Sequence, residues 1–244
     1  QRQMWIRDSI LLVLLLSCGQ QTANTGAVLA VISQGVTVNG NMPTVGMALN
    51  IGDIVATAIG AEAAIEFYNG SIVRLRENTT ITIKKLTTDK DVVLSQQRGQ
   101  TWNRVTKLAG INSYRVETPN TVATVRGTGF KVTVDDERTW IGVADGSVQV
   151  QRVEDDIVVA ETLVQENDQA EIFFDTPETQ HDDIVIEELQ TDDWFEENIE
   201  LDEQYVEEIY TDAGEEMPVE YVEEFAEHTL DETEKALNES DEHL

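Results

Sequence analysis

Short apolar runs separated by turn residues fill most of the chain between residues 26 and 178, and they constrain the fold more than any other feature. The dipeptides Asn69-Gly70 and Asp145-Gly146 lie between such runs and favour two-residue turns between antiparallel strands. In the run 72–75 apolar side chains alternate with Arg74, which is typical of a strand with one buried face. This segment is therefore expected to consist of strands and turns.

About a dozen such runs follow one another at the spacing typical of all-β domains. The sequence predicts a mainly β fold, either a β-roll, a solenoid-like domain or a sandwich, followed by an acidic α-helical tail. The expected strands are 27–32, 54–59, 64–68, 72–75, 80–84, 92–94, 114–116, 122–125, 130–134, 139–143, 147–153, 162–164 and 170–174.

Charge is distributed very unevenly along the chain. The formal net charge is −31, and residues 179–244 hold 26 acidic residues against a single base, Lys235. Residues 1–178 have a net charge of only −6, so the acidity belongs to a tail and not to the whole surface. Because phosphate backbones are bound by clustered Lys and Arg, we expect no nucleic-acid binding.

The acidic tail, residues 179–244, contains apolar residues at helical spacing, with one stripe through Phe195 and Ile199 and another through Val222 and Leu230. We expect helices over 192–212 and 218–238. Their other faces are nearly all acidic, and like charges four residues apart weaken a helix. Two interpretations stay open: a solvated, partly disordered tail, or an electrostatic contact with a basic protein or divalent cations.

The N-terminal residues have the features of a secretory signal, because Arg2 and Arg7 precede a run of seven apolar residues, 10–16. The run ends in Leu15-Leu16-Ser17-Cys18, which resembles the bacterial lipobox, whose cysteine takes a diacylglycerol. Seven residues are too few for a membrane span, which needs about 20. A plain secretory signal and a buried structural segment are the alternatives.

We therefore expect a signal peptide over 1–18, a tether over 19–25, a β domain over 26–178 and the acidic tail over 179–244. A lipid on Cys18 would anchor the protein to a membrane of the bacterial envelope, facing the periplasm or the cell surface.

Catalysis finds little support in this composition. Cys18 is the only cysteine, and all three histidines lie in the acidic tail. The expected β domain thus lacks the residues of Cys/His zinc sites and of most nucleophile–base pairs. We expect no catalytic residue, no metal and no cofactor.

Four motifs, in order, resemble the FecR domain family. Residues 46–57, GMALNIGDIVAT, are similar to its opening stretch G-x-x-L-x-x-G-D-x-V-x-T, and residues 69–79, NGSIVRLRENT, to its next hairpin. Residues 116–119, VETP, and 123–130, ATVRGTGF, resemble its central motif. Residues 143–148, VADGSV, resemble its closing motif. The residues that carry the resemblance are Gly46, Leu49, Gly52, Asp53, Thr57, Gly70, Ser71, Leu75, Thr118, Pro119, Arg126, Gly127, Thr128, Phe130 and Gly146.

Most of these residues have a structural interpretation. Asp53 after Gly52 suits a turn in which the carboxylate bonds nearby amides. Gly127 and Gly129, on either side of Thr128, suggest a bulge or a close backbone approach. For Arg126 two roles are open: it holds buried carbonyls or a carboxylate with its planar guanidinium, or it contacts a ligand.

The resemblance implies an extracytoplasmic β-module for recognition. Well-known members of the family sense siderophore transport and signal to a sigma factor through an anti-sigma segment, a membrane-spanning helix and a second periplasmic subdomain. Since none of these parts is visible here, we expect a stand-alone FecR-domain lipoprotein that acts as a non-enzymatic binding or signalling module with a protein partner in the envelope. The alternative is a structural envelope protein that binds cell-wall polymer or organises other envelope proteins.

Overall fold

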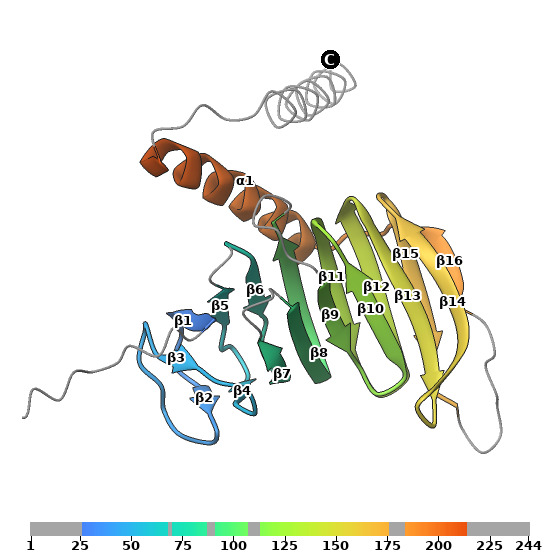
Figure 1. The fold of residues 1–244 in the computed structure, drawn as a ribbon, viewed down its shortest axis with the longest axis horizontal. Coiled ribbons are helices and arrows are strands. Elements are labelled where there is room, and N and C mark those ends of the chain that lie inside the picture. The colour runs from blue at the N-terminus through green and yellow to red at the C-terminus, as the bar shows by residue number, and fades with distance from the viewer. Residues whose placement is uncertain (1–25, 68–69, 87–90, 107–112, 176–183, 214–244) are drawn as a thin grey trace, which may run out of the picture.

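In the part of the chain that the structure describes, two β-sheets share one long strand and form the body, and one helix lies outside them (Figure 1). The computed structural model describes residues 26–67, 70–86, 91–106, 113–175 and 184–213, with the side chains of the helix described as far as Gln204. Within this part of the chain the fold is mainly β, as the sequence predicts.

The first sheet, sheet A, has its strands in the spatial order β3, β1, β5, β6, β8, β11, β12, β15 and β16. Their bounds are β1 (Ala27–Ile32), β3 (Ala48–Leu49), β5 (Ala63–Phe67), β6 (Ile72–Leu75), β8 (Asp91–Val105), β11 (Thr128–Val134), β12 (Arg138–Asp145), β15 (Asp168–Phe173) and β16 (Val185–Glu188). All neighbours in this sheet are antiparallel.

The second sheet, sheet B, runs in the order β2, β4, β7, β8, β9, β10, β13 and β14. The strands not yet given are β2 (Val36–Val38), β4 (Ile54–Thr57), β7 (Thr80–Leu86), β9 (Ser113–Glu117), β10 (Thr121–Val125), β13 (Ser147–Glu154) and β14 (Ile157–Gln165). Among the described strands, only β8 and β9 pair in parallel.

Strand β8 passes from one sheet to the other at Gly99. Residues up to Arg98 pair with β7 and β9 in sheet B, whereas Gly99 and the residues after it pair with β11 in sheet A. Gly99 has a φ of 87°, and a Cβ there would lie 2.4 Å from the Cα of Thr79. Glycine is therefore required at this corner by both the backbone conformation and the space available.

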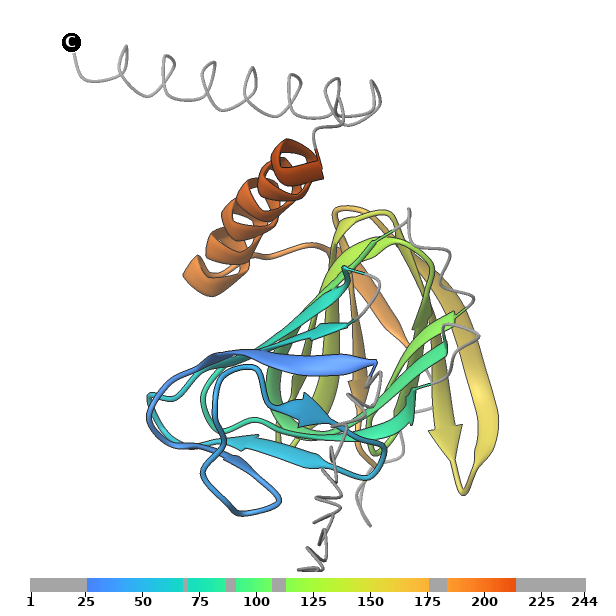
Figure 2. The same ribbon diagram turned by 60° about the vertical axis from the view of Figure 1, so that its left-hand side comes forward.

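The two sheets face each other around one apolar core (Figure 2). Alternation along the strands places Val73 and Leu75 in this core while Arg74 points to the other face, as expected from the sequence. The largest core side chains from the two sheets include Phe67, Phe130 and Tyr114, whose rings pack edge to face. The architecture is thus a two-sheet sandwich with a shared strand.

The helix α1 (Asp193–Ala213) matches the first helix expected from the tail. It follows β16, which extends sheet A within residues 179–244, a range expected to hold only the acidic tail. Three short strands, β2, β3 and β16, lie outside the predicted runs: β2 and β3 have only three and two residues, and β16, Val185–Glu188, does not alternate and lies in the range expected to be the acidic tail. Among the described helical residues, none forms a stretch long and apolar enough to cross a membrane.

Several expectations fall outside the described residues. They are the signal peptide with Cys18, the tether over 19–25 and the second helix over 218–238. The division of the chain into four segments stays a prediction.

Candidate interaction site beneath the helix

The outer face of sheet A carries a band of aromatic and basic side chains, which we call the docking strip: Arg74, Arg76, Trp102, Lys131 and Trp140. Arg74 is paired across the sheet with Trp102, and Trp102 with Lys131, so these three form one row over β6, β8 and β11. They alternate with the core-facing residues of the same strands. The sheet therefore presents large flat rings and cations on the same surface.

Helix α1 lies over the docking strip, outside the sandwich (Figure 2). Its N-cap is Asp192, whose carboxylate accepts a hydrogen bond from the amide of Phe195 at 2.9 Å. The other carboxylate oxygen of Asp192 lies 2.7 Å from Lys131 Nζ and 3.5 Å from Arg76 Nη1. One residue thus both begins the helix and binds it to the cations of the strip.

Aromatic rings fill the space between the helix and the sheet. Phe195 packs edge to face against Trp102, with ring centroids 4.9 Å apart, and against Trp140 at 6.4 Å. Lys131 lies over the rings of Trp140 and Trp194, with Nζ 5.6 and 5.4 Å from the ring centroids. Trp102 and Phe195 are each 1% exposed, so the helix closes this cluster from water.

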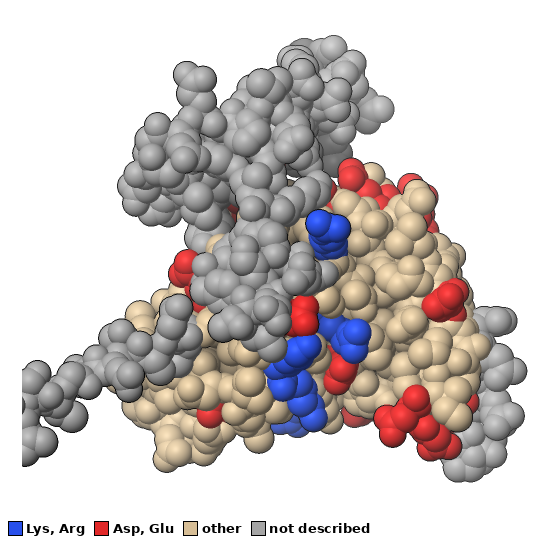
Figure 3. All heavy atoms as spheres, viewed as in Figure 1, with Lys and Arg blue, Asp and Glu red and all other residues tan. Residues whose placement is uncertain are grey.

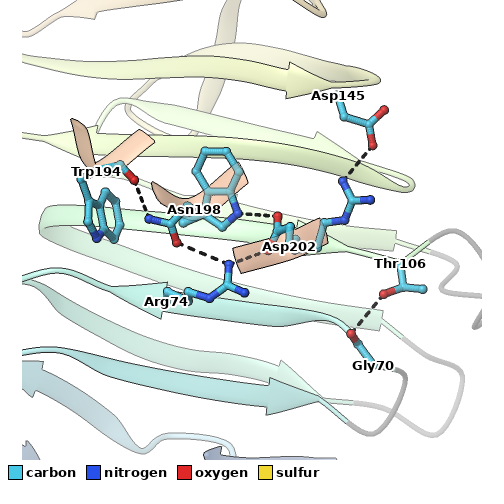
Figure 4. A network of polar contacts seen from close by, with 9 residues as sticks. Gly70, Arg74, Thr106, Asp145, Trp194, Asn198 and Asp202 are labelled. Carbon is cyan, nitrogen blue, oxygen red and sulfur yellow. Dashed lines mark hydrogen bonds and ion pairs between the residues drawn. The ribbon is translucent and has the colours of Figure 1, made fainter. Parts of the chain in front are cut away.

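A polar network holds the second and third turns of α1 against the sheet (Figure 4). Asp202 forms an ion pair with Arg74 and accepts a hydrogen bond from Trp102 Nε1 at 2.7 Å. Asn198 accepts a hydrogen bond of 3.4 Å from Arg74 and donates one of 2.7 Å to the carbonyl of Trp194. Both Asn198 and Asp202 are buried, so polar groups contribute to the packed face of the helix.

Burial shifts the pKa values of the charged groups in this site. Loss of water lowers the pKa of Lys131 despite its contact with Asp192. Burial also raises the pKa of Asp202, and the nearby Arg74 and Arg104 only partly oppose this change. Partial burial acts to raise the pKa of Asp192, but hydrogen bonds from Lys131 and from the Phe195 amide outweigh it, so that pKa is lowered.

The chemistry of this arrangement is recognition of an acidic helix. The carboxylates of Asp192 and Asp202 form ion pairs with cations of the docking strip, and the ring of Phe195 packs against Trp102. Arg and Trp are also the residue types enriched among the residues that contribute most to protein interfaces.

The residues of the FecR-like motifs lie elsewhere, at turns and strand junctions. Asp53 accepts hydrogen bonds from Asn39 Nδ2 at 2.7 Å and from the Asn50 amide at 2.8 Å, which is the turn role expected for it. Thr57 donates to the carbonyl of Arg76 and accepts from the Thr79 amide, joining β4 to the start of β7. The motif residues that the structure buries are Leu49, Thr57, Ser71, Leu75, Gly127, Thr128 and Phe130.

The turns around Gly127 and Gly146 pack against each other. Gly127 has a φ of 78°, and a Cβ on Gly146 would lie 3.0 Å from the carbonyl oxygen of Gly127. The pairing of β11 with β12 shifts register between Gly129 and Phe130, which is the bulge expected there. Positive φ values occur at the motif glycines Gly46, Gly52, Gly70, Gly127 and Gly146.

Thr118 belongs to a buried polar cluster at the β9–β10 turn, next to the exposed Pro119. Asn120 Oδ1 accepts hydrogen bonds from Thr121 and Thr139, and its Nδ2 donates to the carbonyl of Ile172 at 3.0 Å. Thr118 Oγ1 lies 2.9 Å from Thr139 Oγ1. This cluster joins the two sheets.

Arg126 is exposed at the turn between β10 and β11 and has no ion-pair partner among the described residues. The structural role considered for it, a hold on buried carbonyls or a carboxylate, is therefore not seen in this part of the chain. Contact with a ligand stays open for this side chain. In the space-filling view the Lys and Arg side chains of the visible face form several separate patches near its middle, with Asp and Glu side chains both between them and toward the margins (Figure 3).

Sequence reasoning missed the docking strip. A usable signal existed, because Trp102 and Trp140 occupy outward positions of strands, where polar residues are usual. A second signal is Trp194-Phe195 at the start of an otherwise acidic helix.

The fold and this site define a mainly β domain that holds an acidic helix on one outer face. The family model described as FecR protein matches residues 53–149, which confirms the resemblance of this segment to the FecR family. The matched segment includes the whole docking strip, whereas α1 lies beyond it.

Solved structures add a more distant likeness. Two crystal structures, at 1.65 and 2.50 Å resolution, are described as "a putative anti-sigma factor from Parabacteroides distasonis ATCC 8503". Each matches with a TM-score of 0.46 and 19% sequence identity. The match covers 55% of this chain and 59% of that one, less than two thirds of its length. None of the curated proteins matches the sequence.

Proposed function

We propose that the protein is a lipid-anchored, extracytoplasmic FecR-domain protein that acts as a non-enzymatic binding or signalling module in the bacterial envelope. The observation that carries this proposal is the FecR match over residues 53–149. FecR-domain proteins are associated with the envelope, and the cations and aromatic rings of the docking strip support a role in recognition.

The anchor rests on the sequence around Cys18. The basic start, the short apolar run and Leu15-Leu16-Ser17-Cys18 together are typical of a lipoprotein signal. The following segment, 19–25, is small and polar, as a tether requires. Two or three acyl chains on one cysteine hold a protein firmly on a membrane, whereas one chain binds reversibly.

Metabolic labelling with an alkyne fatty acid tests the anchor in cells that express the native gene. We expect label on the wild-type protein and none on Cys18→Ala, with a mature N-terminus that begins at the modified cysteine by mass spectrometry. The matched control is Ser17→Ala, which keeps a small residue before the cysteine and should be labelled like wild type. An unlabelled wild-type protein would contradict the proposal.

Binding to purified envelope fractions separates the module from a structural role. A defined protein crosslinked to the solubilised wild-type chain supports a binding or signalling module. Bulk retention on purified cell wall, without a defined protein partner, would instead favour the structural alternative.

A further inference from the structure

We propose that the docking strip is the partner-binding surface of the FecR domain and that α1 is a displaceable occupant that holds it closed. The partner is a protein segment with the chemistry of α1: an acidic amphipathic helix with an aromatic residue near its N-terminus. This inference rests on the proposed function as a binding module and names the surface and the partner chemistry.

The composition of the strip supports an interface. Its outward face combines Arg74, Arg76 and Lys131 with Trp102 and Trp140 in a chain whose net charge is −31. Without α1 the strip would expose two indole rings and three cations side by side. Exposed aromatic patches of this kind mark interaction sites on soluble domains.

The body does not need α1 to complete its own core. Trp102, Trp194 and Phe195 form a hydrophobic cluster separate from the core between the two sheets. The segment that matches the FecR family supplies the strip but not the helix. Residues 189–192 connect β16 to α1, so the helix can leave the strip without breaking a strand pair.

The polar contacts favour exchange over permanent attachment. Arg74 and Asp202 are both largely removed from water, and Lys131 is 5% exposed. The cost of removing such charges from water offsets much of their mutual attraction. A competing helix that offers carboxylates at the same places can make the same contacts, and it replaces α1 once its concentration exceeds the effective concentration that the covalent link to the body gives α1.

The positions of the contacts define what the partner must present. One carboxylate at the helix N-cap meets Lys131 and Arg76, as Asp192 does. An aromatic ring three residues later enters between Trp102 and Trp140, as Phe195 does. A second carboxylate ten residues after the first meets Arg74 and Trp102, as Asp202 does.

A peptide of residues 190–204 with a fluorescent label provides the probe, titrated by fluorescence anisotropy into full-length protein. Wild type should bind it weakly because α1 occupies the strip. Phe195→Ala in the full chain vacates the strip, since the helix loses its buried anchor, and should bind the peptide at least about tenfold more tightly. Asp202→Ala serves as a second vacating variant, and circular dichroism verifies that both keep their β structure.

Three controls make the result specific. Leu201→Ala alters an exposed residue of the same helix and should bind the peptide like wild type. Arg74→Ala added to Phe195→Ala should abolish the gain. A peptide in which both Trp194 and Phe195 are replaced by alanine keeps every charge and should bind at least about tenfold more weakly than the native peptide.

If wild type and both vacating variants bind the peptide with equal affinity, α1 is not a displaceable occupant of the docking strip. If the native and alanine-substituted peptides bind equally, the partner's aromatic residues are not recognised. Sedimentation of wild type should show a monomer. A concentration-dependent dimer would mean that the docking strip binds α1 of a second copy of this chain, and the proposal of a separate partner protein would then be wrong. None of these results depends on Cys18, so a failed anchor and a failed docking surface are distinguishable.

Discussion

A polar ladder in the interior of the sandwich and the docking strip both bury polar groups, but with different chemistry. Inside, the Tyr114 hydroxyl donates to Asn103 at 2.7 Å, Asn103 donates to Thr101, and Thr101 donates to Gln96. Every member of this ladder is neutral, and burial raises the pKa of Tyr114, which keeps its proton in place. Beneath α1 charged groups, Arg74, Lys131 and Asp202, are largely buried beside the neutral Asn198.

This difference separates a permanent contact from an exchangeable one. A neutral ladder whose members are satisfied costs little desolvation and fixes one packing arrangement. A buried ion pair gains little net free energy, although loss of one partner is costly. We therefore expect the sandwich to be stable by itself and the helix to be attached with a small net free energy.

The largest expected effect is in the sandwich, from Gly99→Ala. The new Cβ would lie 2.4 Å from the Cα of Thr79 in a backbone with a φ of 87°. The steric clash with Thr79 and the positive φ together should lower the free energy of unfolding by about 3 kcal/mol or more. Chemical denaturation of the full chain measures this loss. Gly40→Ala is the matched control, because Gly40 has a φ of 76° but no atom within 4 Å of its Cβ position.

If both glycine variants lose the same stability, backbone strain alone accounts for the effect. The close approach of β8 to Thr79 would then play no part in turning the strand between the two sheets.

The interior could largely be predicted from the sequence, because alternation is a local signal. The runs 72–75 and 27–32 coincide with β6 and β1, and the turn at Asn69-Gly70 lies between two paired strands. Strand β8 is much longer than the expected run 92–94, since polar residues such as Gln96 and Thr101 interrupt the apolar pattern and are nevertheless buried. Their burial depends on partners distant in the sequence, which alternation does not reveal.

A smaller and more local effect is expected from Phe195→Ala at the docking strip. Removal of a fully buried ring costs about 3–5 kcal/mol in a core, but release of the helix limits the loss here. Amide hydrogen exchange should therefore accelerate in residues 193–204 while β11 stays protected. Leu201→Ala, on the exposed side of the same helix, should leave both regions unchanged. Faster exchange in β11 would mean that the helix and the sandwich unfold together.

The docking strip could not be predicted from apolar periodicity. The expected stripe through Phe195 and Ile199 does face the body, but Asn198 and Asp202 share that face. Their partner Arg74 is more than 120 residues away, so only charge complementarity over a long range identifies the contact. One of the two interpretations of the tail was an electrostatic contact with a basic partner, and for α1 the structure shows such contacts with basic side chains of the same chain.

The smallest expected effect is from Asp192→Asn, which isolates one charge of the docking strip. Asparagine caps a helix as well as aspartate does, so the substitution removes the ion pairs with Lys131 and Arg76 but keeps the cap. Because the Asp192 side chain is 47% exposed, solvent screening should limit the loss to about 0.5 kcal/mol, or about twofold in the docking equilibrium. Hydrogen exchange in residues 193–204 at neutral pH measures this change.

The effect of Asp192→Asn should also depend on pH, with a sign fixed by the lowered pKa of Asp192 in the docked state. A carboxyl with a lowered pKa stabilises docking fully above the pKa of a free aspartate, about 3.9, and this contribution is lost as the pH falls through the docked pKa. The difference between wild type and the variant should thus be constant from neutral pH to about 5, decline as the pH falls through about 3.9, and vanish only below the still lower pKa of docked Asp192. Asp193→Asn is the control, since Asp193 is exposed and has no ion pair among the described residues, so it should change docking less. A difference that grows at low pH would show that Asp192 is destabilising where it lies, and the attraction between helix and strip would then come from the aromatic rings alone.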